Sequence, residues 1–191
     1  MEAPLALIAG DSISIGYTPH VRKLLEGRFK VEHHPDNGGT SANMLHHMAE
    51  WILLRDPDVI HINAGLHDLA VDPGKEGPRI TTDQYEKNLR EIVRRLKSET
   101  SARIIWATTT PVVDEWHARV KGFIRRDTHV RVYNRIARKV MEKAGVEIND
   151  LYQVIMDADP KKCIKPDGVH MNDHGNHLLA GAVAKAIAGD M

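Results

Sequence analysis

A serine that follows directly on a short apolar run is the first candidate for chemistry in this chain. Residues 4–9 read PLALIA, and the chain continues with Gly10, Asp11 and Ser12. At a turn from strand to helix, a serine hydroxyl lies beside the free N–H groups of the helix N-terminus, which can stabilise an adjacent oxyanion. The alternative is that Asp11 or Ser12 only caps the helix.

A histidine near the other end of the chain is the second candidate. Residues 166–170 read PDGVH, which places Asp167 three positions before His170. An aspartate at this spacing can fold back onto the imidazole Nδ1–H, and Nε2 is then free to take a proton from a nucleophile. The alternative is a plain turn, because Pro-Asp-Gly is turn chemistry.

Two further segments offer hydrogen-bond donors. Residues 37–43 read NGGTSAN, and their glycines permit a tight loop that exposes backbone N–H groups, as an oxyanion hole needs. Residues 63–68 read NAGLHD and place polar groups at the end of an apolar run. The alternatives are an ordinary loop capped by Thr40 or Ser41, and a buried histidine at His67 with its hydrogen bonds satisfied.

The elements that must position these residues alternate between apolar runs and helical patterns. Near-continuous apolar strands separated by helices are typical of a parallel sheet covered on both faces, so we expect a three-layer α/β/α sandwich with a five-stranded parallel sheet. Strands are expected over 4–9, 29–33, 58–63, 103–108 and 146–148, and helices over 17–26, 41–54, 83–96, 130–143 and 174–187.

Ligands of open α/β sheets bind beyond the carboxyl ends of the strands. Functional residues are therefore expected after the first, third and fourth strands. Two long connections, 71–82 and 111–128, also stand out in the chain.

Composition limits the classes of protein. The chain has 191 residues, 26 basic and 26 acidic side chains and no net charge, which indicates one domain over 1–191 and no field for holding nucleic acid. Cys163 is the only cysteine, so a thiolate metal cluster is excluded. No apolar run approaches the roughly 18 residues of a membrane span. The first eight residues lack the features of a signal peptide, so a soluble, cytoplasmic chain is expected unless a leader has been removed.

Taken together, these segments resemble the SGNH (GDSL-type) hydrolase superfamily, whose four blocks supply a serine, a glycine, an asparagine and a histidine in that order. Residues 10–12 match the first block and residues 167–170 the last, so the resemblance spans almost the whole chain. It implies a flavodoxin-like arrangement of the sheet, with Ser12 as nucleophile, His170 as base and Asp167 as the residue that orients the base.

Two blocks depart from the family pattern. The oxyanion glycine of the second block falls on Ala42, and the asparagine of the third block falls on His67. A backbone N–H of Ala42 can serve if its conformation is compatible, and an imidazole N–H can donate as an amide does. The resemblance therefore implies an oxyanion hole made by Ser12, Ala42 and His67, with substrate contacts from Asp11, Gly39, Asn63 and Trp116.

The 12 histidines invite a metal interpretation. On a helix, His174 and His177 are three positions apart and could share a face. The adjacent pairs His33-His34 and His46-His47 point their rings in different directions, and no H-E-x-x-H motif is present. We therefore expect no metal and no other cofactor.

A basic segment follows the fourth strand. Between residues 119 and 139 the chain carries eight Lys or Arg side chains against one acid, Asp127. From Arg131 onward a solvated helix face is favoured. For Trp116 to Arg126, a solvated surface and a mobile lid are equally favoured interpretations. A lid there would favour acidic or sugar-containing substrates through arginine contacts and aromatic stacking.

The sequence therefore favours a serine esterase that acts on a small or carbohydrate-linked acyl ester, with acetyl as the expected acyl group. The expected partner is a small-molecule or carbohydrate ester, with no nucleic acid or membrane partner, and the oligomeric state stays open. The first alternative is a carbohydrate-binding or scaffolding relative whose site is weakened by His67 and Ala42. The second, a nucleotide-binding protein, is disfavoured because no phosphate-type glycine loop follows the first strand.

Overall fold

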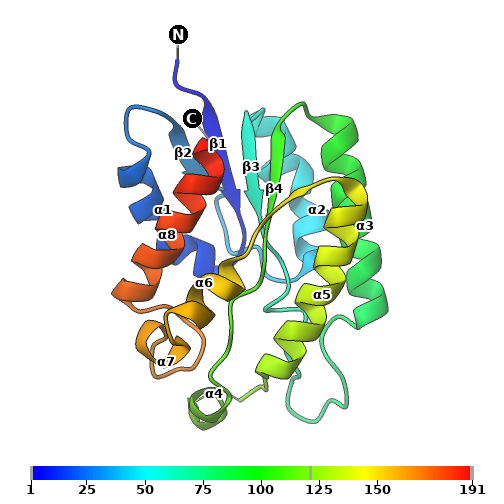
Figure 1. Cartoon of the computed structure of the whole chain (residues 1–191). Helices are drawn as coiled ribbons and strands as arrows, with labels where there is room; N and C mark the ends of the chain where they lie inside the picture. Colours follow the sequence, from blue (N-terminus) through cyan, green and yellow to red (C-terminus); the bar gives the residue numbers. More distant parts are fainter. Residues whose placement is uncertain (1, 121, 190–191) are drawn as a thin grey trace.

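The chain folds around a parallel sheet. The computed structural model describes residues 2–120 and 122–189, and in this part of the chain five strands run parallel in the order β2-β1-β3-β4-β5. They are β1 (Leu5–Ala9), β2 (Lys30–His33), β3 (Val59–Ile62), β4 (Arg103–Ala107) and β5 (Glu147–Asn149). Figure 1 labels the first four of these strands. The predicted five-stranded parallel sheet is confirmed.

Helices cover both faces of this sheet. On one face α1 (Ser12–Leu24) packs against α8 (Asp173–Ala188), so the first and last helices of the chain are neighbours (Figure 1). On the other face lie α2 (Ser41–Trp51), α3 (Thr82–Glu99) and α5 (Asp127–Ala144). The predicted three-layer sandwich is therefore confirmed as well.

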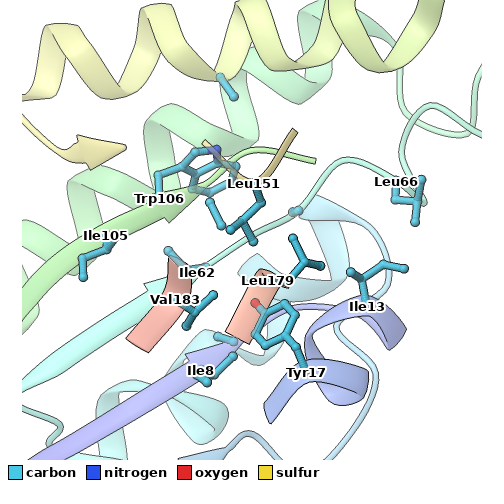
Figure 2. Packing of buried hydrophobic residues seen from close by; sticks show 14 of the residues in the cluster. Ile8, Ile13, Tyr17, Ile62, Leu66, Ile105, Trp106, Leu151, Leu179 and Val183 are labelled. Carbon is cyan, nitrogen blue, oxygen red and sulfur yellow. The ribbon is translucent and has the colours of Figure 1, made fainter. Parts of the chain in front are cut away.

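Apolar side chains fill the space between the layers. Figure 2 shows Ile8 of β1 and Ile62 of β3 beside Leu179 and Val183 of α8, and all four are buried. Each such side chain contributes roughly 1.5–3 kcal/mol through its removal from water. This packing fixes α1 and α8 on the sheet, and with them the residues at their N-termini.

The strand order creates the place where a ligand can bind. β1 pairs with β2 on one side and with β3 on the other, so the connections after β1 and β3 leave the sheet in opposite directions. In parallel α/β sheets this divergence opens a crevice beyond the carboxyl ends of the two strands. The segments that contain Ser12 and His67 both begin at that crevice.

Several elements differ from the sequence predictions. α1 begins five residues before the predicted start at Tyr17, and the predicted helix over 41–54 ends at Trp51 before a short 3-10 turn, η1 (Leu53–Arg55). The long connection 111–128 contains α4 (Asp114–Val120), and two more short helices, α6 (Leu151–Asp157) and α7 (Pro160–Cys163), follow β5. Lys121 of the basic segment lies outside the described residues. No helix of the described part is both long and apolar enough to cross a membrane.

Candidate active site

Ser12, His170 and Asp167 form a hydrogen-bonded series, although 158 positions separate the serine from the histidine. Ser12 is the first residue of α1, and its Oγ lies 2.9 Å from Nε2 of His170. Nδ1 of His170 lies 2.6 Å from Oδ2 of Asp167. All three side chains are partly exposed, so a substrate can reach them. The packing of α1 against α8 brings the two ends of the chain together here.

A tight turn holds Asp167 in place. Its Oδ1 accepts hydrogen bonds from the backbone N–H groups of Val169 and His170, both at 3.0 Å. Gly168 has φ +77°, and a Cβ at that position would lie 2.5 Å from the backbone nitrogen of His117, so only glycine fits. Burial opposes ionisation of Asp167, but the hydrogen bonds from the imidazole and the backbone outweigh it and lower the pKa of this carboxyl.

Hydrogen bonds to the backbone of Gly10 hold the turn that carries Ser12. The backbone carbonyl of Gly10 accepts hydrogen bonds from the backbone N–H of Gly38, at 2.9 Å, and from Nε2 of His34, at 2.8 Å. Asp11 is 3% exposed and caps α1 through Oδ1, which accepts the N–H of Ile13 at 2.9 Å. Capping by Asp11 is therefore confirmed, and it leaves the Ser12 hydroxyl available to His170.

The loop before α2 approaches the Ser12 turn closely. A Cβ at Gly38 would lie 2.7 Å from the carbonyl oxygen of Gly10, so the two backbones are in contact. Thr40 caps α2, and Asn43 Nδ2 donates to the Gly38 carbonyl at 2.9 Å. Ala42 is exposed in the first turn of α2, where backbone N–H groups have no intrahelical acceptor. Because its backbone is helical, alanine is as compatible there as glycine.

A buried carboxylate joins this loop to the one that carries His67. Asp68 is fully buried, and its two oxygens lie 2.9 and 3.0 Å from the backbone nitrogen of Ser41. The Ser41 hydroxyl also donates to Asp68 and accepts a bond from Asn88 Nδ2 at 2.9 Å. Burial raises the pKa of Asp68 to about 6, although the bonds from Ser41 oppose this shift. One carboxylate therefore fixes the loops of Ala42 and His67 relative to each other.

His67 lies in the electrostatic field of the same site. Burial lowers its pKa, Asp11 opposes that shift, and the nearby side chains of Arg125, Arg79 and His170 reinforce it. The ring is therefore neutral at pH 7 and carries one N–H. A neutral imidazole can donate one hydrogen bond to an oxyanion, as the family's asparagine amide does.

The other residues predicted to contact substrate, Asn63, Gly39 and Trp116, lie in different parts of the structure. Asn63 Nδ2 donates to the backbone carbonyl of Ala107 at 2.7 Å, so this amide is already engaged between two strands. Gly39 has φ +61° and shapes the loop before α2. Trp116 is partly buried on α4 and packs against the core.

Sequence reasoning missed three residues at this site. Asp68 and Ser41 stand next to the predicted donors, and a carboxylate following His67 was the signal that could have indicated the tie between the loops. Arg125 was counted in the basic segment, but it is 5% exposed and donates from Nε to the carbonyl of Leu66 at 2.8 Å. A run of basic residues gives no sign that one of them is buried.

His174 and His177 both lie on α8, where both side chains are exposed. His177 lies beside His20 of α1, with ring centroids 4.1 Å apart, and Asp173 completes a cluster whose ligand atoms lie within 4.8 Å of one another. Asp173 is 85% exposed, and its carboxylate has ordinary solvated contacts. The cluster lies at the α1–α8 contact and includes none of Ser12, His170 and Asp167.

A serine, a histidine and an aspartate in hydrogen-bonded series, at the carboxyl edge of a parallel α/β/α sheet, are the arrangement typical of serine hydrolases. The chain belongs to the GDSL-like Lipase/Acylhydrolase family, whose sequence profile matches residues 8–178. The expected membership of the SGNH (GDSL-type) superfamily is confirmed.

Two curated relatives have low identity to the chain. GDSL esterase/lipase CPRD49 of Arabidopsis thaliana is 24% identical over 139 residues, which cover 69% of this chain and 54% of the relative. The isoamyl acetate-hydrolyzing esterase 1 homolog of Homo sapiens is 26% identical over 130 residues, which cover 64% of this chain and 52% of the relative. The matched part of the chain spans about half the length of each curated relative.

Solved structures share the fold over nearly the whole chain. The lipase/acylhydrolase from Enterococcus faecalis superposes with a TM-score of 0.81 at 20% identity, over 96% of this chain and 95% of that one. The acetyl xylan esterase AlAXEase gives 0.79 at 19% identity, over 96% and 99%. Axe2, an acetylxylan esterase from Geobacillus stearothermophilus, gives 0.78 at 20% identity, over 98% and 95%. At these identities the likeness establishes the fold alone.

Proposed function

We propose that this protein is a serine esterase that hydrolyses small acyl esters, with acetyl esters, including carbohydrate-linked ones, as the expected substrates. The observation that carries the proposal is the hydrogen-bonded series from Ser12 through His170 to Asp167. Ser12 also stands at the N-terminus of α1, where free N–H groups favour a developing negative charge.

In the proposed mechanism, Ser12 Oγ attacks the ester carbonyl carbon while His170 Nε2 takes the hydroxyl proton. Asp167 holds the imidazole by its Nδ1–H and stabilises the imidazolium that forms. The backbone N–H groups of Ser12 and Ala42 and the ring N–H of His67 receive the carbonyl oxygen as it becomes an oxyanion. His170 then gives its proton to the leaving alcohol, and water, with His170 as base again, hydrolyses the acyl-enzyme.

The relatives support the choice of acetyl esters. AlAXEase and Axe2 are described as acetyl xylan esterases, and the human relative as an isoamyl acetate-hydrolyzing esterase homolog. A small acyl group is also consistent with the partly buried positions of Ser12 and His170.

A carbohydrate-binding or scaffolding relative with a weakened site is the alternative. Two observations favour the active enzyme over it: the helical backbone at Ala42 accommodates alanine, and His67 is neutral at pH 7 and able to donate. The alternative predicts slow hydrolysis that is indifferent to the serine.

The test is a panel of acetylated sugars and simple acyl esters assayed with wild type and Ser12→Ala. We expect wild type to hydrolyse at least one acetyl ester and Ser12→Ala to lose turnover on the order of a million-fold. Ser98→Ala, a change of an exposed serine on α3, is the matched control and should keep wild-type activity. Unchanged turnover in folded Ser12→Ala would overturn the proposal.

A further inference from the structure

Arg125 is a buried cation beside the candidate active site. It is 5% exposed and lies between α4 and α5. Its Nε donates to the carbonyl oxygen of Leu66, the residue before His67, at 2.8 Å. Its guanidinium carbon lies 4.7 Å from the centre of the Phe123 ring. These contacts fix the side chain, but none of them neutralises its charge.

No carboxylate within residues 2–120 and 122–189 forms an ion pair with Arg125. Asp11 and Asp167 are close enough to favour its charged form, but Asp167 bonds His170, and Asp11 caps α1 through Oδ1 while its buried Oδ2 accepts no hydrogen bond from the described part of the chain. Burial lowers the pKa of Arg125 to about 10, so the guanidinium stays charged at neutral pH. Burying a charge without a partner is costly, and such groups are usually paired.

A second arginine lies near Arg125, but its charge is paired with a carboxylate. Arg79 lies against the same Phe123 ring, 5.1 Å from its centre, and Asp72 holds it by two hydrogen bonds from Nε at 3.0 Å. Both arginines lower the pKa of His67. A groove of about 540 Å³ opens beside Arg125, with His117 and Phe123 among its lining residues. Its lining also holds Arg126 and the carboxyl groups of Asp114 and Glu115, and Glu115 is paired with Lys161 at 2.7 Å. His117 packs on the Asp167 turn, so the groove lies next to the candidate triad.

We propose that Arg125 binds a carboxylate carried by the ester substrate. The inference rests on the proposed esterase function and narrows its substrate class to esters that bear a negative charge. A guanidinium suits this task because its planar fork donates two parallel hydrogen bonds to a carboxylate. The carboxylate can stand on the acyl side or on the alcohol side of the ester.

The experiment compares esters that differ only in charge. On the acyl side, monoethyl succinate is paired with ethyl levulinate, in which a methyl ketone replaces the carboxylate. On the alcohol side, 4-acetoxybenzoate is paired with 4-acetoxyacetophenone by the same replacement. Acid release at constant pH gives kcat/KM for wild type, Arg125→Met and Arg135→Met, the last being a change of an exposed arginine on α5.

We expect wild type to prefer the charged member of at least one pair by tenfold or more. Arg125→Met should lower that preference about 10- to 100-fold, the effect of losing hydrogen bonds to a charged group, whereas Arg135→Met should leave it within twofold. A purely structural role for Arg125 would instead lower kcat/KM equally for both members of a pair. Two results would overturn the inference. One is an equal loss of kcat/KM for the charged and the neutral ester in Arg125→Met, and the other is a wild-type enzyme that shows no preference for the charged ester in either pair.

Failure of this inference is distinguishable from failure of the proposed function. If wild type hydrolyses neutral esters in a Ser12-dependent way and shows no preference for charged esters, the proposed anion site is wrong and the proposed esterase function still holds. If circular dichroism shows that Arg125→Met does not fold, the preference of wild type for the charged esters still tests the inference. Arg125→Lys, which keeps the charge but not the planar fork, should then retain part of that preference.

Discussion

The two edges of the sheet treat charge in opposite ways. At the amino edge, Arg103 of β4 pairs with Glu147 of β5 at 2.7 Å, and their side chains are 39% and 43% exposed. At the carboxyl edge, Asp11, Asp68 and Arg125 are 3%, 0% and 5% exposed. This ion pair is thus solvated where the strands begin, whereas Asp11, Asp68 and Arg125 are buried where the strands end.

The difference separates charged groups that water solvates from charged groups that the fold buries. Exposed ion pairs contribute about 0–1 kcal/mol, because water competes for both partners. Buried charges cost stability, and burial moves their pKa values, as for Asp68 at about 6 and Arg125 at about 10. Groups with such shifts in a crevice are typical of functional sites. Substitutions at the two edges should therefore differ in kind.

Loss of the base at the carboxyl edge should have the largest effect. His170→Ala removes the imidazole that lies within bonding distance of the Ser12 hydroxyl and serves as base in the proposed mechanism. Turnover of an acetyl ester should then fall on the order of a million-fold. His46→Ala, a change of an exposed histidine on α2, should keep wild-type turnover in the same assay. A loss smaller than a hundredfold in His170→Ala would contradict the assignment of the base.

Loss of the third oxyanion donor should come next. His67→Ala should lower kcat about a hundred- to a thousand-fold with little change in KM, because the donor acts mainly on the charge that develops in the transition state. His67→Asn restores the amide of the family pattern and should recover most of that loss. Steady-state kinetics on one acetyl ester measure both variants. Equal activity in His67→Ala and wild type would remove this residue from the oxyanion hole.

Loss of the buried Asp68 carboxylate, which connects the loops of Ala42 and His67, should mainly lower the stability of the fold. Asp68→Asn replaces one of the oxygens that accept the Ser41 N–H and hydroxyl with an amide donor, and it should cost about 1–3 kcal/mol of unfolding free energy in urea. Glu76→Gln changes an exposed carboxylate of the long loop and should cost nothing measurable. An Asp68→Asn protein as stable as wild type would show that the buried carboxylate does not hold the loops.

Acid should destabilise the folded protein through its buried histidines. Burial lowers the pKa of His61 to about 3 and of His33 to about 4, from 6.5. Below pH 6.5 both histidines are protonated in the unfolded chain but stay neutral in the folded protein. Each of them therefore lowers the unfolding free energy by about 1.4 kcal/mol for every pH unit of acidification. Asp68 acts in the opposite direction, because its pKa is raised and the fold takes up a proton first.

These two histidines act against Asp68 together with His34 and His67, whose pKa values burial also lowers. The unfolding free energy should therefore fall between pH 6.5 and about 4. Urea titrations at several pH values measure this slope. His61→Gln should remove its share of about 1.4 kcal/mol per pH unit. A slope that does not change in His61→Gln would contradict the neutral state of this histidine in the fold.

The amino edge should give the smallest effect. Glu147→Gln removes the exposed carboxylate that Arg103 contacts, and it should lower the unfolding free energy by less than about 1 kcal/mol. Activity should not change, since the pair lies at the far end of the strands. A loss above 2 kcal/mol, or a measurable loss of turnover, would weaken the contrast between the two edges.

The sequence predicted the parts of this molecule that follow from local pattern. The apolar runs of β1 and β3 indicated buried parallel strands, and the motifs around Ser12 and His170 indicated which residues meet. The short helices α4, α6 and α7 were missed because four to seven residues are too few to display a helical period.

The missed parts of the site depend on contacts between distant segments. Arg125 stands in a basic run that resembles a solvated surface, and only the packing of its loop over Leu66 buries it. Asp68 bonds Ser41 across 27 positions of the chain, and no spacing rule connects the two. Tertiary packing decides which charged residues are buried, and it is not visible in a local window.

The central claim is that the Ser12 hydroxyl, activated by His170, is the nucleophile. The most direct measurement treats wild type, Ser12→Ala and His170→Ala with a serine-directed phosphonate and maps the adduct by peptide mass spectrometry. We expect one adduct on Ser12 of wild type, loss of ester hydrolysis in proportion to labelling, and no adduct in either variant. Hydrolysis that persists when Ser12 is fully labelled, or an adduct on a different residue, would contradict it.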